Sequence, residues 1–131
     1  MPQSQRHAQR QRIIESLYQV DLGAQEAFES SEIPFIHETL TGIFEHLAEI
    51  DAIISESLVG YTLKRLSYVD RAIIRLAVYE MAFTQTPTEI ILNEALELTH
   101  TYTDLGDQKS VAFNNRLLEN IYEALKGKNH G

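Results

Sequence analysis

Cysteine and tryptophan are absent from this chain, and proline occurs only three times in 131 residues. Without cysteine, disulfide bonds, thiolate metal ligands and cysteine nucleophiles are all excluded. No apolar run approaches the roughly 18 residues that a membrane-spanning helix needs, so we expect no membrane association. The N-terminal residues are rich in arginine and glutamine and contain no apolar core, unlike a secretory signal peptide. Together these absences predict a cytoplasmic protein.

The remaining composition is that of an ordinary globular protein, with 44% hydrophobic and 23% charged residues. The length fits a single domain. A chain of this size buries roughly two-thirds of its unfolded surface, so it needs no disulfide or metal in order to fold. It is too short to hold a nucleotide-cofactor domain together with a substrate domain.

The net charge of −8 argues by itself against a nucleic-acid-binding protein. The charges are, however, segregated along the chain. The first twelve residues contain three arginines and one histidine but no acid, whereas residues 13–63 contain ten acids and no lysine or arginine. A second basic cluster follows at residues 64–75, where Asp70 is the only acid. This division indicates two surfaces with different partners, although a basic leader on an acidic globule would produce the same pattern.

Apolar residues recur at steps of three and four over most of the chain, which is the period of amphipathic α-helices. The sequence shows neither the alternation typical of strands nor an internal repeat. The expected helices cover residues 13–22, 34–47, 50–58, 69–81, 87–102 and 113–125. The pattern therefore predicts an all-α fold, a compact bundle of six or seven helices.

Particular residues predict where these helices begin and end. Glycine ends a helix readily because it adopts positive φ, and on this basis we expect helix ends at Gly23, Gly60 and Gly127. The apolar pattern also breaks near Ala48. Ser67 is expected to cap the next helix with its hydroxyl, with Asp70 in the first turn. Thr86 and Pro87 form another start signal, in which threonine is the cap and proline the first helical residue.

Catalytic and metal-binding patterns are not found in the sequence. None of the five histidines pairs with another at the helical spacing of a zinc site. Glu97 and His100 form a Glu-x-x-His motif, but di-iron bundles require two such motifs, and a solvated helix face is the better explanation of a single one. A glycine-rich phosphate loop and a Gly-x-Ser-x-Gly elbow are both missing. We therefore expect no enzymatic activity, no cofactor and no bound metal.

Four blocks of sequence carry a family resemblance. They read RHAQRQRIIESLYQ from Arg6, VDRAIIRLAVYEM from Val69, NEALEL from Asn93 and GDQKSVAFNNRLLENI from Gly106. In this order and spacing they resemble the NusB family of bacterial transcription antitermination factors. The resemblance implies two small helical lobes packed together, forming a single NusB-like RNA-binding helical domain over residues 1–131. Residues 1–12 would be a basic leader that runs into the first helix.

The resemblance also implies a function. Family members bind boxA-type RNA, a single-stranded segment, together with the small-subunit ribosomal protein NusE. In the RNA polymerase antitermination complex they promote readthrough, notably during ribosomal RNA synthesis, and some of them self-associate as homodimers. Two alternatives stay open: a helical protein-interaction adaptor that has lost RNA binding, and a separated NusB-like domain of an RNA methyltransferase.

The family's RNA contacts lie partly in its arginine-rich start, which Arg6 and Arg10 match. These two arginines are four residues apart and would share one helix face, where guanidinium groups can bind phosphate. His7 stands where a further arginine is usual. Tyr18 and Tyr61 match aromatic positions of the family and could stack on unpaired bases, although half-buried packing would also explain them.

The resemblance assigns further residues to RNA and partner binding. Lys109 precedes the last helix, where backbone donors and a lysine can meet phosphate. Phe113 matches a family phenylalanine on the RNA side, and it also begins the apolar stripe of the last helix. Asp70 and Glu80 fall in the best-matching block and are expected to bind the basic ribosomal partner, although helix capping and solvation would also place acids there.

The last block departs from the family pattern at three positions. Ala112 stands in place of a lysine, Asn114 in place of a valine and Arg116 in place of a glycine. The lost lysine and the histidine in the leader would weaken RNA binding, whereas Arg116 would restore one charge. The sequence leaves open whether these departures give a divergent family member with an altered RNA preference.

Overall fold

The computed structural model describes residues 3–23, 32–58, 60, 62–103 and 108–130. These residues form six α-helices and one short 3₁₀ helix, without any strand, which confirms the predicted all-α fold. The elements are α1 (Gln3–Asp21), α2 (Pro34–Glu45), α3 (Leu47–Ser57), η2 (Leu63–Arg65), α4 (Tyr68–Phe83), α5 (Thr88–Thr103) and α6 (Gln108–His130). No helix in this part of the chain is both long enough and apolar enough to cross a membrane.

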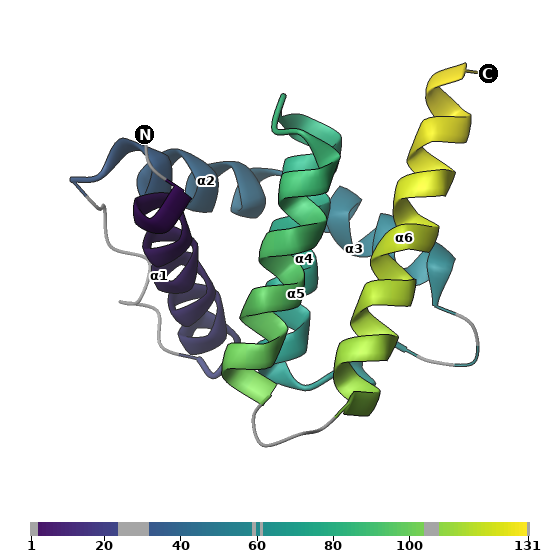
Figure 1. Cartoon of the computed structure of the whole chain (residues 1–131), viewed down its shortest axis with the longest axis horizontal. Helices are drawn as coiled ribbons and strands as arrows, with labels where there is room; N and C mark the ends of the chain where they lie inside the picture. The colour runs from purple at the N-terminus through teal and green to yellow at the C-terminus, as the bar shows by residue number, and fades with distance from the viewer. Residues whose placement is uncertain (1–2, 24–31, 59, 61, 104–107, 131) are drawn as a thin grey trace.

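Helix α4 is the centre of the bundle and contacts each of the other five α-helices. Its residues 72–78 are all buried, because neighbouring helices surround it on every side. Helices α1 and α6 lie on opposite sides of α4 and α5 (Figure 1), and α1 also packs on α2 while α6 packs on α5. This arrangement separates the start of α1 from the start of α6.

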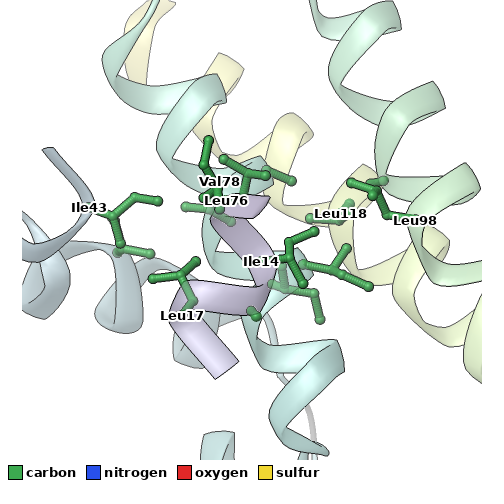
Figure 2. Packing of buried hydrophobic residues seen from close by; sticks show 14 of the residues in the cluster. Ile14, Leu17, Ile43, Leu76, Val78, Leu98 and Leu118 are labelled. Atoms are coloured by element: carbon green, nitrogen blue, oxygen red, sulfur yellow. The ribbon is translucent and has the colours of Figure 1, made fainter. Parts of the chain in front are cut away.

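Apolar side chains from α1, α2, α4, α5 and α6 meet in one core (Figure 2). Members of this cluster are Ile14, Leu17, Ile43, Leu76, Val78, Leu98 and Leu118. Each of these side chains is at most 3% exposed. The stripe expected along the last helix is only partly inward, since Leu117 and Ile121 are buried whereas Phe113 is 36% exposed.

Several predicted helix boundaries are confirmed. Helix α1 is followed by Gly23 with φ +95°, and the Gly23 N–H donates to the carbonyl of Val20 at 2.9 Å. The Ser67 hydroxyl caps α4 by accepting the backbone N–H of Asp70 at 3.0 Å. The break expected near Ala48 lies two residues earlier, at the junction of α2 and α3.

Two boundary predictions are wrong, and the first helix begins earlier than its apolar pattern indicated. Gly127 does not end the last helix, because α6 continues to His130. Pro87 is not the first residue of α5, which begins at Thr88; instead its carbonyl accepts the first helical bonds, from the N–H groups of Ile90 and Ile91. The leader is helical almost from its start, since α1 begins at Gln3.

Candidate nucleic-acid interface

Arg10 is buried in the structure and binds Glu80. Its side chain donates from Nε and Nη2 to the two carboxylate oxygens of Glu80, at 2.8 Å each. The two residues are 3% and 2% exposed. Burial lowers the pKa of Arg10, but the hydrogen bonds and charge of Glu80 outweigh burial and raise this pKa above its ordinary value. A phosphate at Arg10 or a basic partner at Glu80 would have to displace this buried pair, so the two predicted contacts stay predictions.

Two of the other three basic leader residues, Arg6 and His7, also contact side chains within the protein, and the third, Arg12, is exposed. The Arg6 guanidinium lies 3.9 Å from the ring centroid of Phe35 and donates to Gln9 Oε1 at 3.0 Å. The Nδ1 atom of His7 lies 2.6 Å from a carboxylate oxygen of Glu94 in α5. Although the leader sequence contains no acid, acidic side chains from α4 and α5 contact basic side chains of the leader in the folded protein. Arg6 remains half-buried, so one of the predicted leader contacts stays partly accessible.

One cluster of metal-ligating side chains occurs among the described residues. His7, Glu94 and Glu97 offer ligand atoms that all lie within 4.8 Å of one another. The cluster could hold a divalent cation only if the cation replaced the contact between His7 and Glu94. The only ligand pair considered from the sequence is Glu97 with His100, and no metal is expected there. Because His7 is 87 residues from Glu94 in the chain, spacing could not reveal the cluster.

The second basic cluster, residues 64–75, is divided by the fold. Arg75 points inward and binds Asp51 through two bonds of 2.9 Å and Asp21 through two of 3.2 Å. Burial lowers the pKa of Arg75, but the bonds and charges of Asp51 and Asp21 raise it above its ordinary value. Arg71 donates to the backbone carbonyls of Lys64 and Leu66 at 3.2 Å. Arg75 therefore links α4 to α1 and α3, and Arg71 links α4 to the segment that precedes it, while Lys64 and Arg65 are exposed.

An open depression of about 240 Å³ lies where α4 and α6 begin. It is lined by Arg65, Leu66, Ser67, Asp70, Lys109, Ser110 and Phe113. Two of the predicted RNA-binding residues, Lys109 and Phe113, thus lie together beside Arg65. Asp70 lies here too, rather than on a separate acidic surface, and it accepts a hydrogen bond from Asn114 Nδ2 at 3.0 Å. The carboxylate reduces the positive charge of this depression but leaves it with two cations.

A second depression of about 240 Å³ lies on α6 towards the end of α3. Its lining residues are Ser57, Leu58, Phe113, Arg116, Leu117 and Asn120. Phe113 lines both depressions. Arg116 is exposed, so the helix accommodates the arginine by directing it to solvent.

A third depression, of about 320 Å³, lies between α1, α4 and α5. It is lined by Ile14, Glu15, Tyr18, Gln19, Val69 and Tyr102. The ring of Tyr18 packs edge-on against that of Tyr68, with centroids 6.2 Å apart. Tyr102 donates its hydroxyl to Glu15 at 2.9 Å, and burial together with Glu15 raises the pKa of Tyr102 to about 12. Tyr18 is thus half-buried in an apolar setting, and Tyr61 lies outside the described residues.

The structure does not gather the predicted RNA-binding residues into one site. In Figure 1 the start of α1 and the start of α6 lie on opposite sides of α5 and at opposite ends of the bundle. Arg6, His7 and Arg10 belong to the first location, whereas Lys109 and Phe113 belong to the second. The sequence prediction does not place Arg65 beside Lys109 and Phe113. It gives Arg116 a compensating charge but does not use the helical spacing of four and three residues that puts Lys109, Phe113 and Arg116 on one face.

Comparisons with known proteins agree with this fold. A profile of the NusB family matches residues 2–123. The transcription antitermination protein NusB of Bacillus subtilis is 37% identical over 125 residues, covering 88% of this chain and 93% of that protein. The protein of the same name from Shouchella clausii is 39% identical over 136 residues, covering 94% and 98% of the two chains.

Two solved structures share the arrangement of helices. A T. maritima NusB structure has a TM-score of 0.78 at 29% identity, covering 94% of this chain and 92% of that chain. A crystal structure of the antitermination factors NusB and NusE in complex with dsRNA has a TM-score of 0.75 at 28% identity, covering 91% and 96%. The profile match over most of the chain, the identity to these relatives and the shared helical fold show that the chain belongs to the NusB family.

Proposed function

We propose that this chain is a transcription antitermination factor that binds boxA-like single-stranded RNA jointly with a NusE-type ribosomal protein. The observation that carries the proposal is the cationic and aromatic surface at the start of α6. A related structure that contains NusB and NusE in complex with dsRNA supports joint binding of RNA and protein. In this proposed role the protein binds RNA and NusE and holds them for RNA polymerase without any chemical change, so the proposal includes no cofactor and no catalytic step.

The proposed RNA surface centres on the exposed side chains of Lys109 and Phe113. Arg65 and Arg116 are exposed, each in one of the two depressions that Phe113 lines, and Lys64 is exposed next to Arg65 in the chain. Cations neutralise phosphates, and an exposed aromatic ring can stack on an unpaired base without regard to its sequence. Arg6 would contribute at a more distant part of the RNA. Arg10 instead acts through Glu80, by holding α1 on α4.

The proposed partner surface is the depression between α1, α4 and α5. Its tyrosine and aliphatic side chains offer apolar area, and the carboxylate of Glu15 lies at its edge. The side chain of Glu97 in α5 is 65% exposed and adds negative charge near α1 and α5. This combination suits a basic protein better than RNA. We therefore place Tyr18 in partner binding rather than base stacking.

Substitution of Lys109 tests the RNA surface. Lys109→Gln should weaken binding of a labelled boxA-like RNA and lower the log–log salt slope by about 0.7, the contribution of one single-strand phosphate contact. Lys126→Gln is the matched control, because it makes the same change of charge at another exposed position of α6. Equal slopes for the wild type and Lys109→Gln would exclude Lys109 from the RNA surface.

Joint binding is tested by titrating the same RNA with and without saturating NusE protein, at low and high salt. A basic partner on the acidic surface removes repulsion that acts within a Debye length of roughly 8–10 Å. We expect NusE to tighten RNA binding by about 5–150-fold at low salt, with a smaller factor at high salt. NusE binding without RNA binding would favour the protein-interaction adaptor. RNA affinity that is the same with and without NusE would favour a separated methyltransferase domain.

A further inference from the structure

We infer that the depression between α3 and α6 is a second nucleobase site, in which Arg116 binds the neighbouring phosphate. The inference rests on the proposed function, because it extends the RNA surface along α6. A strand that contacts Lys109 and Phe113 would continue past Arg116 towards Asn120. The site would thus hold the nucleotide next to the one bound beside Arg65.

Helical spacing places four exposed side chains of α6 in one line. Lys109, Phe113, Arg116 and Asn120 follow one another at steps of four, three and four residues, and all four are exposed. Lys109 and Arg116 are two turns apart, which is about 10 Å along the helix axis at 1.5 Å per residue. The line alternates cation, aromatic ring, cation and amide. A single strand presents the matching series of phosphates and bases.

The lining of the depression suits one nucleobase. Leu58 and Leu117 supply apolar area against which the flat faces of a base can lie. The Asn120 amide and the Ser57 hydroxyl supply donors and acceptors for the edge of a base. A volume of about 240 Å³ is below the roughly 300–1,000 Å³ of sites for drug-sized ligands, so it fits a single ring system.

The charge of the depression selects an anionic ligand. Among the residues that the structure describes, Arg116 is the only charged one in the lining, and no carboxylate lines it, in contrast to the neighbouring depression with Asp70. A guanidinium group binds a phosphate through two parallel hydrogen bonds. Because Phe113 lines both depressions, bases in the two sites would lie on either side of it. The arrangement therefore favours two successive nucleotides over an isolated ligand.

The first test replaces Arg116 by glutamine and titrates boxA-like RNA over a range of salt concentrations. Arg116→Gln should weaken binding several-fold and lower the salt slope by about 0.7. Lys126→Gln, with the same change of charge on the same helix, should change affinity by less than twofold. Circular dichroism checks that both variants keep the helical fold. Equal affinity and slope for the wild type and Arg116→Gln would overturn the site.

The second test locates the base. Abasic nucleotides are placed at each position of the RNA in turn, and the wild type should lose about tenfold in affinity at two adjacent positions, the usual size of one stacking contact. Asn120→Ala should abolish the loss at one of these positions and keep it at the other. If Asn120→Ala loses as much affinity as the wild type when either of the two nucleotides is made abasic, a base site beside Asn120 is refuted. Absence of any wild-type RNA binding would refute the proposed function and this site together, whereas binding that ignores both variants would refute the site alone.

Discussion

Removal of either partner of the Arg10–Glu80 pair should destabilise the fold, whereas replacement of both partners should not. The two side chains are 4% and 3% exposed, so either one would be left as a buried, unpaired charge. Such single changes cost about 3–5 kcal/mol, which is a large part of the roughly 5–15 kcal/mol that stabilises a typical domain. We expect Arg10→Met to cost more stability than Glu80→Leu. When Glu80 is removed, Glu94 still lies close enough to stabilise the Arg10 charge, whereas removal of Arg10 leaves Glu80 without its partner.

The double variant Arg10→Met with Glu80→Leu buries no charge and keeps similar side-chain volumes. Buried ion pairs replaced in this way are often neutral or stabilising by about 1–4 kcal/mol. The coupling energy between the two positions should therefore exceed about 3 kcal/mol, well above the few tenths expected for independent sites. A loss of this size in either single variant corresponds to a fall in melting temperature of about 10–20 °C.

Urea denaturation followed by circular dichroism gives the four free energies of unfolding. The double variant also tests function, because a phosphate contact from Arg10 would be lost while the fold is retained. We expect RNA affinity within about twofold of the wild type at a temperature where both are folded. Additive destabilisation by the two single changes would refute the buried pair. A tenfold loss of RNA affinity in the folded double variant would show that Arg10 contacts RNA.

Three further predictions concern stability and titration. Leu117→Ala should cost about 2–5 kcal/mol in chemical denaturation, while Phe113→Ala should cost less than about 1 kcal/mol because Phe113 is 36% exposed. Absorbance at 295 nm should show a tyrosine that titrates near pH 12, and this titration should be missing in Tyr102→Phe. Because folding raises the pKa of Tyr102, this group contributes its full stabilisation of the fold below about pH 10 and loses it as the pH rises through 12. Gly42→Ala should destabilise by about 1–3 kcal/mol, although alanine is normally the better helix former, because its Cβ would overlap Tyr79; recovery by Tyr79→Leu checks the cause.

Local features of the chain were predicted well because they depend on nearby residues. The helical period, the Ser67 cap and the end of α1 before Gly23 each involve groups within four residues of one another. Gly127 misled the prediction because one glycine within a helix costs only about 1 kcal/mol, and no other signal ends the helix there. Local rules therefore set the helices but not every boundary.

The direction of each helix face was predicted less well. Phe113 belongs to two series on α6, one with Leu117 and Ile121 and one with Lys109 and Arg116. Both series have helical spacing, so the pattern alone cannot decide which of them faces the core. Packing of α6 on α4 and α5 buries Leu117 and Ile121 and leaves Phe113 at the surface. Only this packing shows that a phenylalanine interrupts a line of cations.

By itself the sequence determined the all-α class, most helix positions and membership of the NusB family, because these depend on short-range periodicity and on ordered motifs. The tertiary structure decided which charges are available to a ligand. Arg10 and Glu80 are 70 residues apart, and Arg75 is 54 residues from Asp21, so nothing local marks them as partners. A charge buried in a protein must be paired, and the partner is whichever opposite charge the fold brings into contact. Segregated charge along a chain therefore does not become segregated charge on a surface until the helices have packed.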